Sequence, residues 1–460
     1  MKLTLFSKYN IIFLLAICTF SSCQLGKHYT RPKLELPETL DSLSVDSNSI
    51  GDYPWEQLYT DTTLQNLIRK TLIYNKDMLI AAARIKELAA MKRIDYANLF
   101  PQVGLKAYAE KEADNYGGNH YNEDNEFELK GIATWELDLW GKLRWARDKS
   151  VAEFVGSIEN QQALKMSLIA QVAQSYFELV ALDNELAIVK KTVEARQEGL
   201  HLIRLRYEGG LIPEIPFRQA QVELARTATL VPDLERQITL KENEISFLAG
   251  EYPHRINRSV LSEEVILPGS LPVGLPSRLL ERRPDIRKAE QDLIAANASV
   301  GVAFTNLFPT ISLTASYGGE SEELRDLLKS PHHLLSANLL QPVFAMGKNR
   351  AILKAKKAAF EQATYAYEKT VLNAFKDAYN AISEFSKTKE IYETRLRLEQ
   401  SSKSALELAQ LQYLNGYIGY IDLLDAQRGY LDAQIALNNA IRDKQLTMVK
   451  LYKALGGGWQ

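Results

Sequence analysis

Cysteine is nearly absent from this chain of 460 residues, which contains only Cys18 and Cys23. Cys18 lies inside an apolar run, residues 11–20, that follows a basic start and is too short to span a membrane. Two serines then lead directly into Cys23. This order is typical of a bacterial lipoprotein signal, so we expect residues 1–22 to be removed and Cys23 to be acylated. Ordinary secretion with cleavage nearby is the alternative. One mature cysteine would exclude an intrachain disulfide.

Long apolar segments and an excess of charge of one sign are also missing. After the N-terminal run, no stretch approaches the ~20 apolar residues of a transmembrane helix. The 55 basic and 57 acidic residues nearly balance, which does not indicate a nucleic-acid partner. Any insertion into a membrane must therefore depend on β-strands or on lipid.

An internal repeat organises the rest of the chain. The sequence Asn-Leu-Phe-Pro at residues 98–101 recurs at residues 306–309, and Gly141-Lys142 recurs as Gly347-Lys348. A third set follows, in which Tyr207, Gly210, Ile212, Ala220 and Gln221 recur as Tyr413, Gly416, Ile418, Ala426 and Gln427. We therefore predict a first repeat at residues 62–249 and a second at residues 277–456.

Prolines separate these repeats from the other segments. Residues 250–276 form a proline-rich connector, and the proline-dotted residues 23–61 are expected to form an N-terminal linker and belt. Residues 457–460 would be a C-terminal tail.

Helices dominate each repeat. An Ala-rich helix is expected at residues 64–98 and again at 277–306, each stopped at its Asn-Leu-Phe-Pro corner. Residues 142–206 and 348–414 contain no proline, and at ~1.5 Å per residue each could reach about 95–100 Å. A glycine turn follows each long helix and leads into a return helix, at residues 217–249 and 421–455. Such lengths are typical of coiled coils or extended bundles.

Between the helices, polar and apolar residues alternate at 102–109, 126–139 and 310–317, with a less regular run at 334–344. This period predicts strands with one apolar and one polar face. Their length suits tilted membrane strands of ~9–11 residues. Four strands cannot close a barrel, so copies of the chain must complete it, or the sheet is soluble. Two copies would give eight strands and three would give twelve; periodicity does not choose.

No residues form a catalytic or metal-binding pattern. The six histidines lack the spacing of a metal or nucleophile site. His332 and His333 are expected in an outer loop, as an exposed pair rather than a metal site. Glu136 and Asp138 lie on the polar strand face, where we interpret them as pore-lining charges. The acidic residues 110–128 are interpreted as a solvated loop, with a constriction over the pore as the alternative. We predict no enzymatic activity, no metal and no cofactor.

Three motifs then lead to a family. Residues 23–32 read Cys-Gln-Leu-Gly-Lys-His-Tyr-Thr-Arg-Pro. Residues 279–286 read Leu-Leu-Glu-Arg-Arg-Pro-Asp-Ile, with Ala289-Glu290 after them, and residues 423–428 read Leu-Leu-Asp-Ala-Gln-Arg. These resemble the TolC-like outer membrane factors, in particular the lipoprotein branch (NodT-type) that serves resistance-nodulation-division efflux systems.

The resemblance implies a fold that is mainly α-helical with membrane β-strands. Three chains would share one barrel of twelve strands, and their helices would form a periplasmic tunnel. The chain would be the outer-membrane exit duct of a tripartite efflux pump, lipid-anchored and extending far into the periplasm. Its implied partners are two further copies, a periplasmic adaptor, an inner-membrane resistance-nodulation-division transporter and outer-membrane lipid. A protein-secretion duct and a periplasmic coiled-coil scaffold lipoprotein without a pore are the alternatives.

The resemblance also assigns site residues. Adaptor docking falls on the turns at Gly210-Leu211 and Gly416-Tyr417, against the simpler view that these are only turns. A periplasmic gate falls on three residues of the second repeat, Tyr413, Asp422 and Asp425. The two acids would also suit a helix start. Pro216 and Ile418 stand where TolC carries an aspartate and an arginine, so a salt-bridge latch must use other residues or be absent.

Overall fold

The computed structural model describes residues 24–35, 37, 49–114, 117–118, 122–258, 276–342 and 344–459. The predicted acylation site Cys23 and most of the connector lie outside these residues. The chain divides into two compact units. Unit 1 comprises Met1–Leu34, Ala83–Ile158 and Arg287–Lys369; unit 2 comprises Glu35–Ala82, Glu159–Ile286 and Thr370–Gln460.

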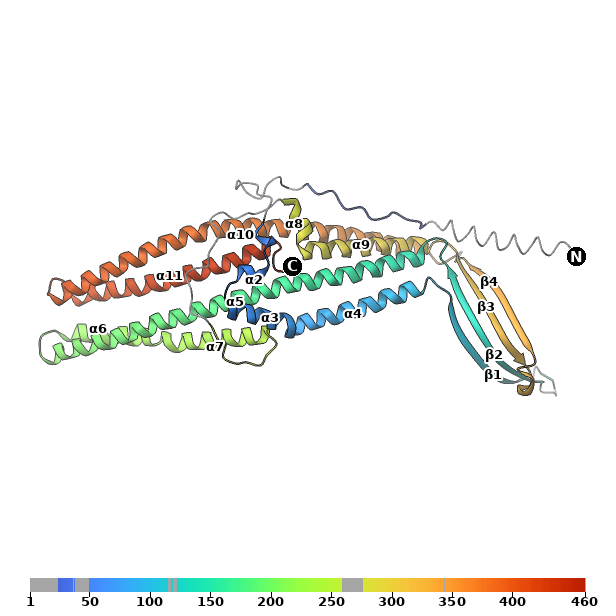
Figure 1. The fold of residues 1–460 in the computed structure, drawn as a ribbon, viewed down its shortest axis with the longest axis horizontal. Coiled ribbons are helices and arrows are strands. Elements are labelled where there is room, and N and C mark those ends of the chain that lie inside the picture. The colour runs from blue at the N-terminus through green and yellow to red at the C-terminus, as the bar shows by residue number, and fades with distance from the viewer. Residues whose placement is uncertain are drawn as a thin grey trace. The chain divides into compact units, whose positions relative to one another are not determined.

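Unit 1 contains one antiparallel sheet of four strands in the order β1-β2-β3-β4 (Figure 1). The strands are β1 (Gln102–Asp114), β2 (Asn122–Leu137), β3 (Thr310–Ser321) and β4 (Pro331–Leu340), with the short helix η2 (Leu324–Asp326) between the last two. Each repeat therefore supplies two neighbouring strands, as the alternation predicted.

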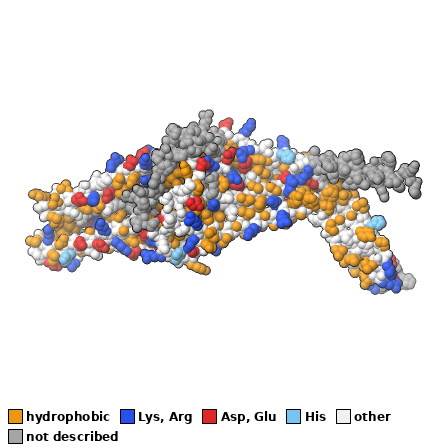
Figure 2. All heavy atoms as spheres, viewed as in Figure 1, with side chains coloured by type: hydrophobic (Ala, Val, Ile, Leu, Met, Phe, Trp, Pro, Cys, Tyr) orange, Lys and Arg blue, Asp and Glu red, His pale blue; other side chains and the backbone are white. Residues whose placement is uncertain are grey.

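The strand register separates an apolar from a polar face. One row across the sheet consists of Val103, Ala133, Ala315 and Leu335, and the next row consists of Gln102, Thr134, Thr314 and Ser336. Residues opposite one another in an antiparallel sheet share a face, so the rows alternate in polarity. Large apolar side chains on the strands stay exposed in the single chain, and Figure 2 shows apolar side chains gathered there.

Strands β1, β2 and β3 are longer than predicted and β4 begins earlier, which corrects two expectations. Glu110 and its neighbours to Asp114 continue β1, and β2 already begins at Asn122, so residues 110–128 are mostly strand rather than loop. β4 begins at Pro331, so His332 and His333 are strand residues rather than residues of an outer loop. Their partners across β3 are Gly318 and Tyr317, and successive strand residues point to opposite faces. The two imidazoles therefore cannot chelate one ion together.

The long helices are α5 (Lys142–Glu208) and α10 (Lys348–Leu414), with α10 ending as predicted and α5 two residues later. The return path of the second repeat is one helix, α11 (Tyr420–Ala454). That of the first is split into α6 (Glu214–Ala228) and α7 (Leu230–Leu248). Pro232 lies in the first turn of α7 and cannot donate the backbone hydrogen bond that would bridge the break. None of the described helices has both the length and the apolarity required to cross a membrane.

The two Ala-rich helices are each interrupted, which the sequence reading missed. The first consists of α3 (Thr62–Tyr74) and α4 (Lys76–Ala97), and the second of α8 (Pro276–Arg282) and α9 (Pro284–Thr305). At the first break, the Asn75 side chain accepts from the N–H groups of Asp77 and Met78 and donates to the Leu248 carbonyl at 2.9 Å. Asn75 therefore starts α4 while fastening it to the end of α7.

At the second break, Pro284 begins α9 and the Arg283 side chain is buried. Its guanidinium pairs with Asp285 and donates to the backbone carbonyls of Ala374 and Ala454. The Arg-Arg-Pro-Asp motif thus joins the start of α9 to α10 and to the end of α11.

The core of unit 2 lies where α3, α5, α7 and the end of α11 meet. Its fully buried apolar side chains include Leu64, Ile68, Val172, Leu179, Ile245 and Leu451. Tyr176, also buried, donates its hydroxyl to Asp61 at 2.6 Å. The short helices η1 (Ile50–Asp52) and α2 (Trp55–Leu58) add Ile50 and Trp55 to the buried set.

Candidate functional site

Two helical hairpins of unit 2 end in turns of the same geometry. Gly210 and Gly416 have φ of +71° and +77°, a left-handed conformation that glycine adopts without strain. At the first turn, the Leu211 N–H donates to the Arg206 carbonyl at 2.8 Å and the Gly210 N–H to Tyr207 at 2.9 Å. The second turn repeats this pattern through Tyr417 and Gly416. Both long helices thus end in a Schellman motif.

The residue after each glycine is a large apolar side chain that stays in solvent. In Schellman motifs this residue commonly packs back on its own helix. Here Leu211 is 77% exposed and Tyr417 is 82% exposed. The two turns therefore each present an uncovered apolar side chain in the single chain.

The three predicted gate residues lie at the second turn. Tyr413, near the end of α10, has its ring 5.7 Å from that of Tyr420 and 5.6 Å from the Arg206 guanidinium. Asp422 is exposed and accepts the Gly419 N–H at 2.9 Å, so it caps the start of α11. Asp425, one turn later, is also exposed. Both carboxylates are accessible in one chain, as a gate would require, but Asp422 also performs the helix-start role.

Near these turns lies a buried ion cluster that sequence reasoning missed. Glu223 of α6 accepts from Arg196 of α5 at 3.2 Å with one oxygen and from Arg428 of α11 with the other. The side chains of Glu223 and Arg196 are only 3% and 7% exposed. Thr227 completes the cluster through its hydroxyl, which bonds the Glu223 carbonyl at 2.9 Å. We call Arg196, Glu223 and Arg428 the clamp, because it joins α11 to the α5–α6 hairpin.

Charge pairing keeps the clamp ionised. The hydrogen bond from Arg428 is the main cause that lowers the pKa of Glu223 below its ordinary value, and burial opposes it. Burial lowers the pKa of Arg196, with Glu223 acting in the other direction. Pro216 and Ile418, which the resemblance aligns with latch residues, carry no charge, and Glu223 of the clamp lies on the same helix, α6, as Pro216. An open hollow of about 420 Å³ lies beside it, lined by Glu214, Ile215, Arg218, Gln219, Val222, Glu223 and Arg428.

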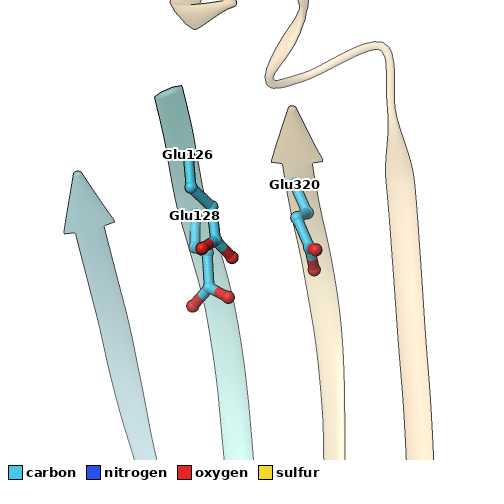
Figure 3. A group of neighbouring side chains, drawn as sticks. All are labelled: Glu126, Glu128 and Glu320. Carbon is cyan, nitrogen blue, oxygen red and sulfur yellow. The ribbon is translucent and has the colours of Figure 1, made fainter. Parts of the chain in front are cut away.

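The polar face of the sheet carries a second charge cluster. Glu126 and Glu128 of β2 and Glu320 of β3 bring carboxylate oxygens within 4.8 Å of one another (Figure 3). Lys130 forms ion pairs with both Glu128 and Glu320, and Lys106 pairs with Glu128 at 2.7 Å. Lysines therefore pair with two of the three acids, Glu128 and Glu320, so we interpret the cluster as a cross-strand ladder of ion pairs rather than a metal site.

Of the two predicted pore-lining residues, only the strand position of Asp138 needs correction. Asp138 lies beyond the end of β2, where it accepts from the N–H groups of Leu143 and Arg144 and caps the start of α5. Glu136 is on β2, but its carboxylate pairs with Lys142 at 2.9 Å. The alternation had included Asp138 because the sequence pattern continues past the point where the chain leaves the sheet.

Comparison with known proteins agrees with this architecture. The family described as "Outer membrane efflux protein" matches residues 67–251 and 275–457. The chain belongs to this family. It is 27% identical over 450 residues to the cation efflux system protein CusC of Escherichia coli O6:H1, covering 96% of each chain. It is 27% identical over 456 residues to the probable outer membrane lipoprotein SilC of Salmonella typhimurium, covering 98% of each.

A solved structure of the outer-membrane channel OprN has the same fold. It superimposes with a TM-score of 0.88 at 29% identity, covering 95% of this chain and 100% of that one. The chain is thus an outer-membrane efflux channel with membrane β-strands and periplasmic helices, and its family is one of transport proteins.

Proposed function

We propose that this chain is the exit duct of a tripartite pump and acts as a homotrimer that exports small molecules unchanged from the periplasm. The observation that supports this most is the four-stranded sheet. It has one apolar and one polar face, and its edge strands β1 and β4 have no further partner within the described residues. Open edges are not tolerated in hydrocarbon, and membrane barrels begin at ~8 strands. Copies of the chain would supply the missing strands, and three would give the twelve strands that the family resemblance implies.

Planar bilayers test this function. Purified protein should insert as a complex with the mass of three chains and produce discrete conductance steps. A periplasmic scaffold would give no conductance, and monomeric protein without steps would contradict the proposal. Deletion of the gene should also sensitise cells to exported compounds. The name of the Escherichia coli relative, a cation efflux protein, makes metal cations one class to test beside drugs.

The two turns are proposed as the docking points for a periplasmic adaptor that couples the duct to an inner-membrane resistance-nodulation-division transporter. Their exposed side chains Leu211 and Tyr417 support this role, because uncovered apolar residues at two equivalent tips suit a protein partner. Tyr413, Asp422 and Asp425 are proposed to line the periplasmic gate. Cys23 is proposed as the acylated N-terminus that anchors the duct to the outer membrane.

The clamp is proposed to hold the α10–α11 hairpin against the α5–α6 hairpin. Glu223 supports this role because it bonds arginines from both hairpins and is shielded from water. Glu223 would form the ion pairs between the hairpins that the uncharged Pro216 and Ile418 cannot form.

A further inference from the structure

The first described residues of the chain are held tightly within unit 1. The Leu25 N–H donates to the Trp140 carbonyl at 3.1 Å, and the Trp145 indole N–H donates back to the Leu25 carbonyl at 2.8 Å. The Gln24 amide donates to Asp148 at 3.0 Å. These contacts lie where β2 ends and α5 begins, so the chain is held at this junction from residue 24 on.

A single carboxylate on α9 holds the other end of this segment. Arg31 donates to both oxygens of Glu290, at 2.6 Å each, and the Tyr29 hydroxyl donates to the same carboxylate at 3.1 Å. Two parallel bonds between a guanidinium and a carboxylate are among the strongest polar contacts in proteins. Between the two ends, the Asn297 amide donates to the Lys27 carbonyl at 3.2 Å.

Glycines permit the close approach. A Cβ on Gly141, whose φ is +82°, would lie 2.8 Å from the Gln24 Cα. A Cβ on Gly301 would lie 2.3 Å from the Trp145 ring. Residues 24–31 and the Trp145 ring therefore fit here only because both positions lack a side chain.

The other repeat forms the same elements without these residues. In the register that aligns Asn98 with Asn306, Glu290, Asn297 and Gly301 correspond to Ala82, Ala89 and Arg93. In the register that aligns Gly141 with Gly347, Trp145 corresponds to Ala351, and a Cβ on Gly347 would meet nothing within 4 Å. The same helix–strand elements thus form in both repeats, but the residues that contact the N-terminal segment or leave room for the Trp145 ring (here called the receptor residues: Trp145, Glu290, Asn297 and Gly301) occur in only one.

We infer that residues 24–31, here called the strap, occupy a dedicated seat on α5 and α9 that fixes the start of the mature chain at the junction of β2 and α5. Resting on the proposed acylation of Cys23, the seat sets where the lipid leaves the protein, because residue 23 is one peptide bond from Gln24. The anchor and the membrane strands then enter the outer membrane as one unit, and the anchor is not a free tether.

A spin label in the strap tests this inference in the purified full-length complex. Lys27→Cys places the label mid-strap at an exposed position. Its spectrum should show restricted motion with the native seat and fast motion after Glu290→Ala or Arg31→Ala. Arg31 lies on the strap itself, so its variant leaves the helices intact. In protein that keeps Lys27, trypsin should cut after Lys27 at least about tenfold faster in Glu290→Ala and in Arg31→Ala than in the native protein. The reason is that both substitutions remove the charged hydrogen bonds between Arg31 and Glu290, which hold the strap closed to the protease.

Asp292→Ala is the matched control, since Asp292 lies on the same helix and, among the described residues, pairs with Lys288, whose side chain is 40% exposed. It should leave the label restricted, and the charge exchange of Arg31→Glu with Glu290→Arg should restore restriction. Equal mobility in native protein and Glu290→Ala, or equal loosening by Asp292→Ala, would overturn the inference. Mass spectrometry of residue 23 separates the two proposals: an immobile strap without acylation would refute the lipid anchor and retain the seat.

Discussion

Removal of the clamp carboxylate is the most informative perturbation. Glu223→Ala leaves Arg196 buried without its anionic partner, whereas Arg428, which is 39% exposed, can turn toward water. Breaking a buried pair by removing one partner costs about 3–5 kcal/mol. Because only one of the two arginines stays trapped, we expect the lower end, about 3 kcal/mol.

Glu214→Ala provides the comparison on the same helix. Glu214 pairs with Arg218 one turn on, and both side chains are more than half exposed. Exposed pairs at this spacing contribute about 0.3–0.5 kcal/mol. The two substitutions therefore remove the same chemical group and are expected to differ in cost about sixfold or more.

Amide hydrogen exchange read by mass spectrometry measures this difference locally. Opening of α6 and of the start of α11 should become about a hundredfold more frequent in Glu223→Ala, since each 1.4 kcal/mol is about a factor of ten. Peptides of the β-sheet should exchange as before. If Glu223→Ala and Glu214→Ala gave the same small change, or if α11 were unaffected, Glu223 would not hold the two hairpins together.

The clamp should also respond to acid in a defined direction. The pKa of Glu223 is lower in the folded protein than its ordinary value, chiefly through Arg428. Its stabilisation is therefore fully present above the unfolded pKa of about 4.3 and is lost as the pH falls through the lower folded pKa. The exchange difference between native protein and Glu223→Ala should be constant from pH 6 to 8 and shrink only below about pH 4. A difference that shrinks near neutral pH would assign the effect to another group.

The other proposals make separate predictions. Mass spectrometry of the purified protein should find a lipidated Cys23 as the N-terminus, and an unmodified start elsewhere would refute this. Tyr417→Ser should reduce efflux at normal trimer level, whereas Gly416→Trp should abolish it and also distort a turn whose φ is +77°; full resistance in both would exclude docking there. Joint replacement of Asp422 and Asp425 by alanine should weaken cation selectivity and block by multivalent cations in bilayers, and unchanged selectivity would show that these two acids do not determine it.

Features set by local sequence were predictable. The bounds of α10 matched, because residues 348–414 contain no proline or glycine and the flanking turns are marked by Gly347 and Gly416. The two faces of the strands followed from period-two alternation. The end of β1 and the beginning of β2 did not, because the residues from Glu110 to Asp114, apart from Ala113, and their partners from Asn122 on are polar on both faces. Backbone pairing continues there without any pattern in hydrophobicity.

Features that depend on tertiary contacts were not predictable. Asn75 interrupts a helical pattern because a distant carbonyl, that of Leu248, fixes its side chain. Arg196, Glu223 and Arg428 lie in three different helices, and no spacing rule connects them. Only Arg428 carried a signal, as the last residue of the Leu-Leu-Asp-Ala-Gln-Arg motif, and that signal did not identify its partner.

The clamp and the strap seat share one property that the repeat makes visible. In the register that aligns Gly210 with Gly416, Glu223 corresponds to Gly429, Arg428 to Val222 and Arg196 to Ser402. The positions that correspond to Glu223 and Arg428 in the other repeat are thus a glycine and a valine, which cannot form an ion pair. The clamp therefore forms once per chain and not twice. The receptor residues of the strap are likewise alanine or arginine in the other repeat. Duplication thus accounts for the shared backbone, and the charged residues that break the repeat give the two halves different contacts.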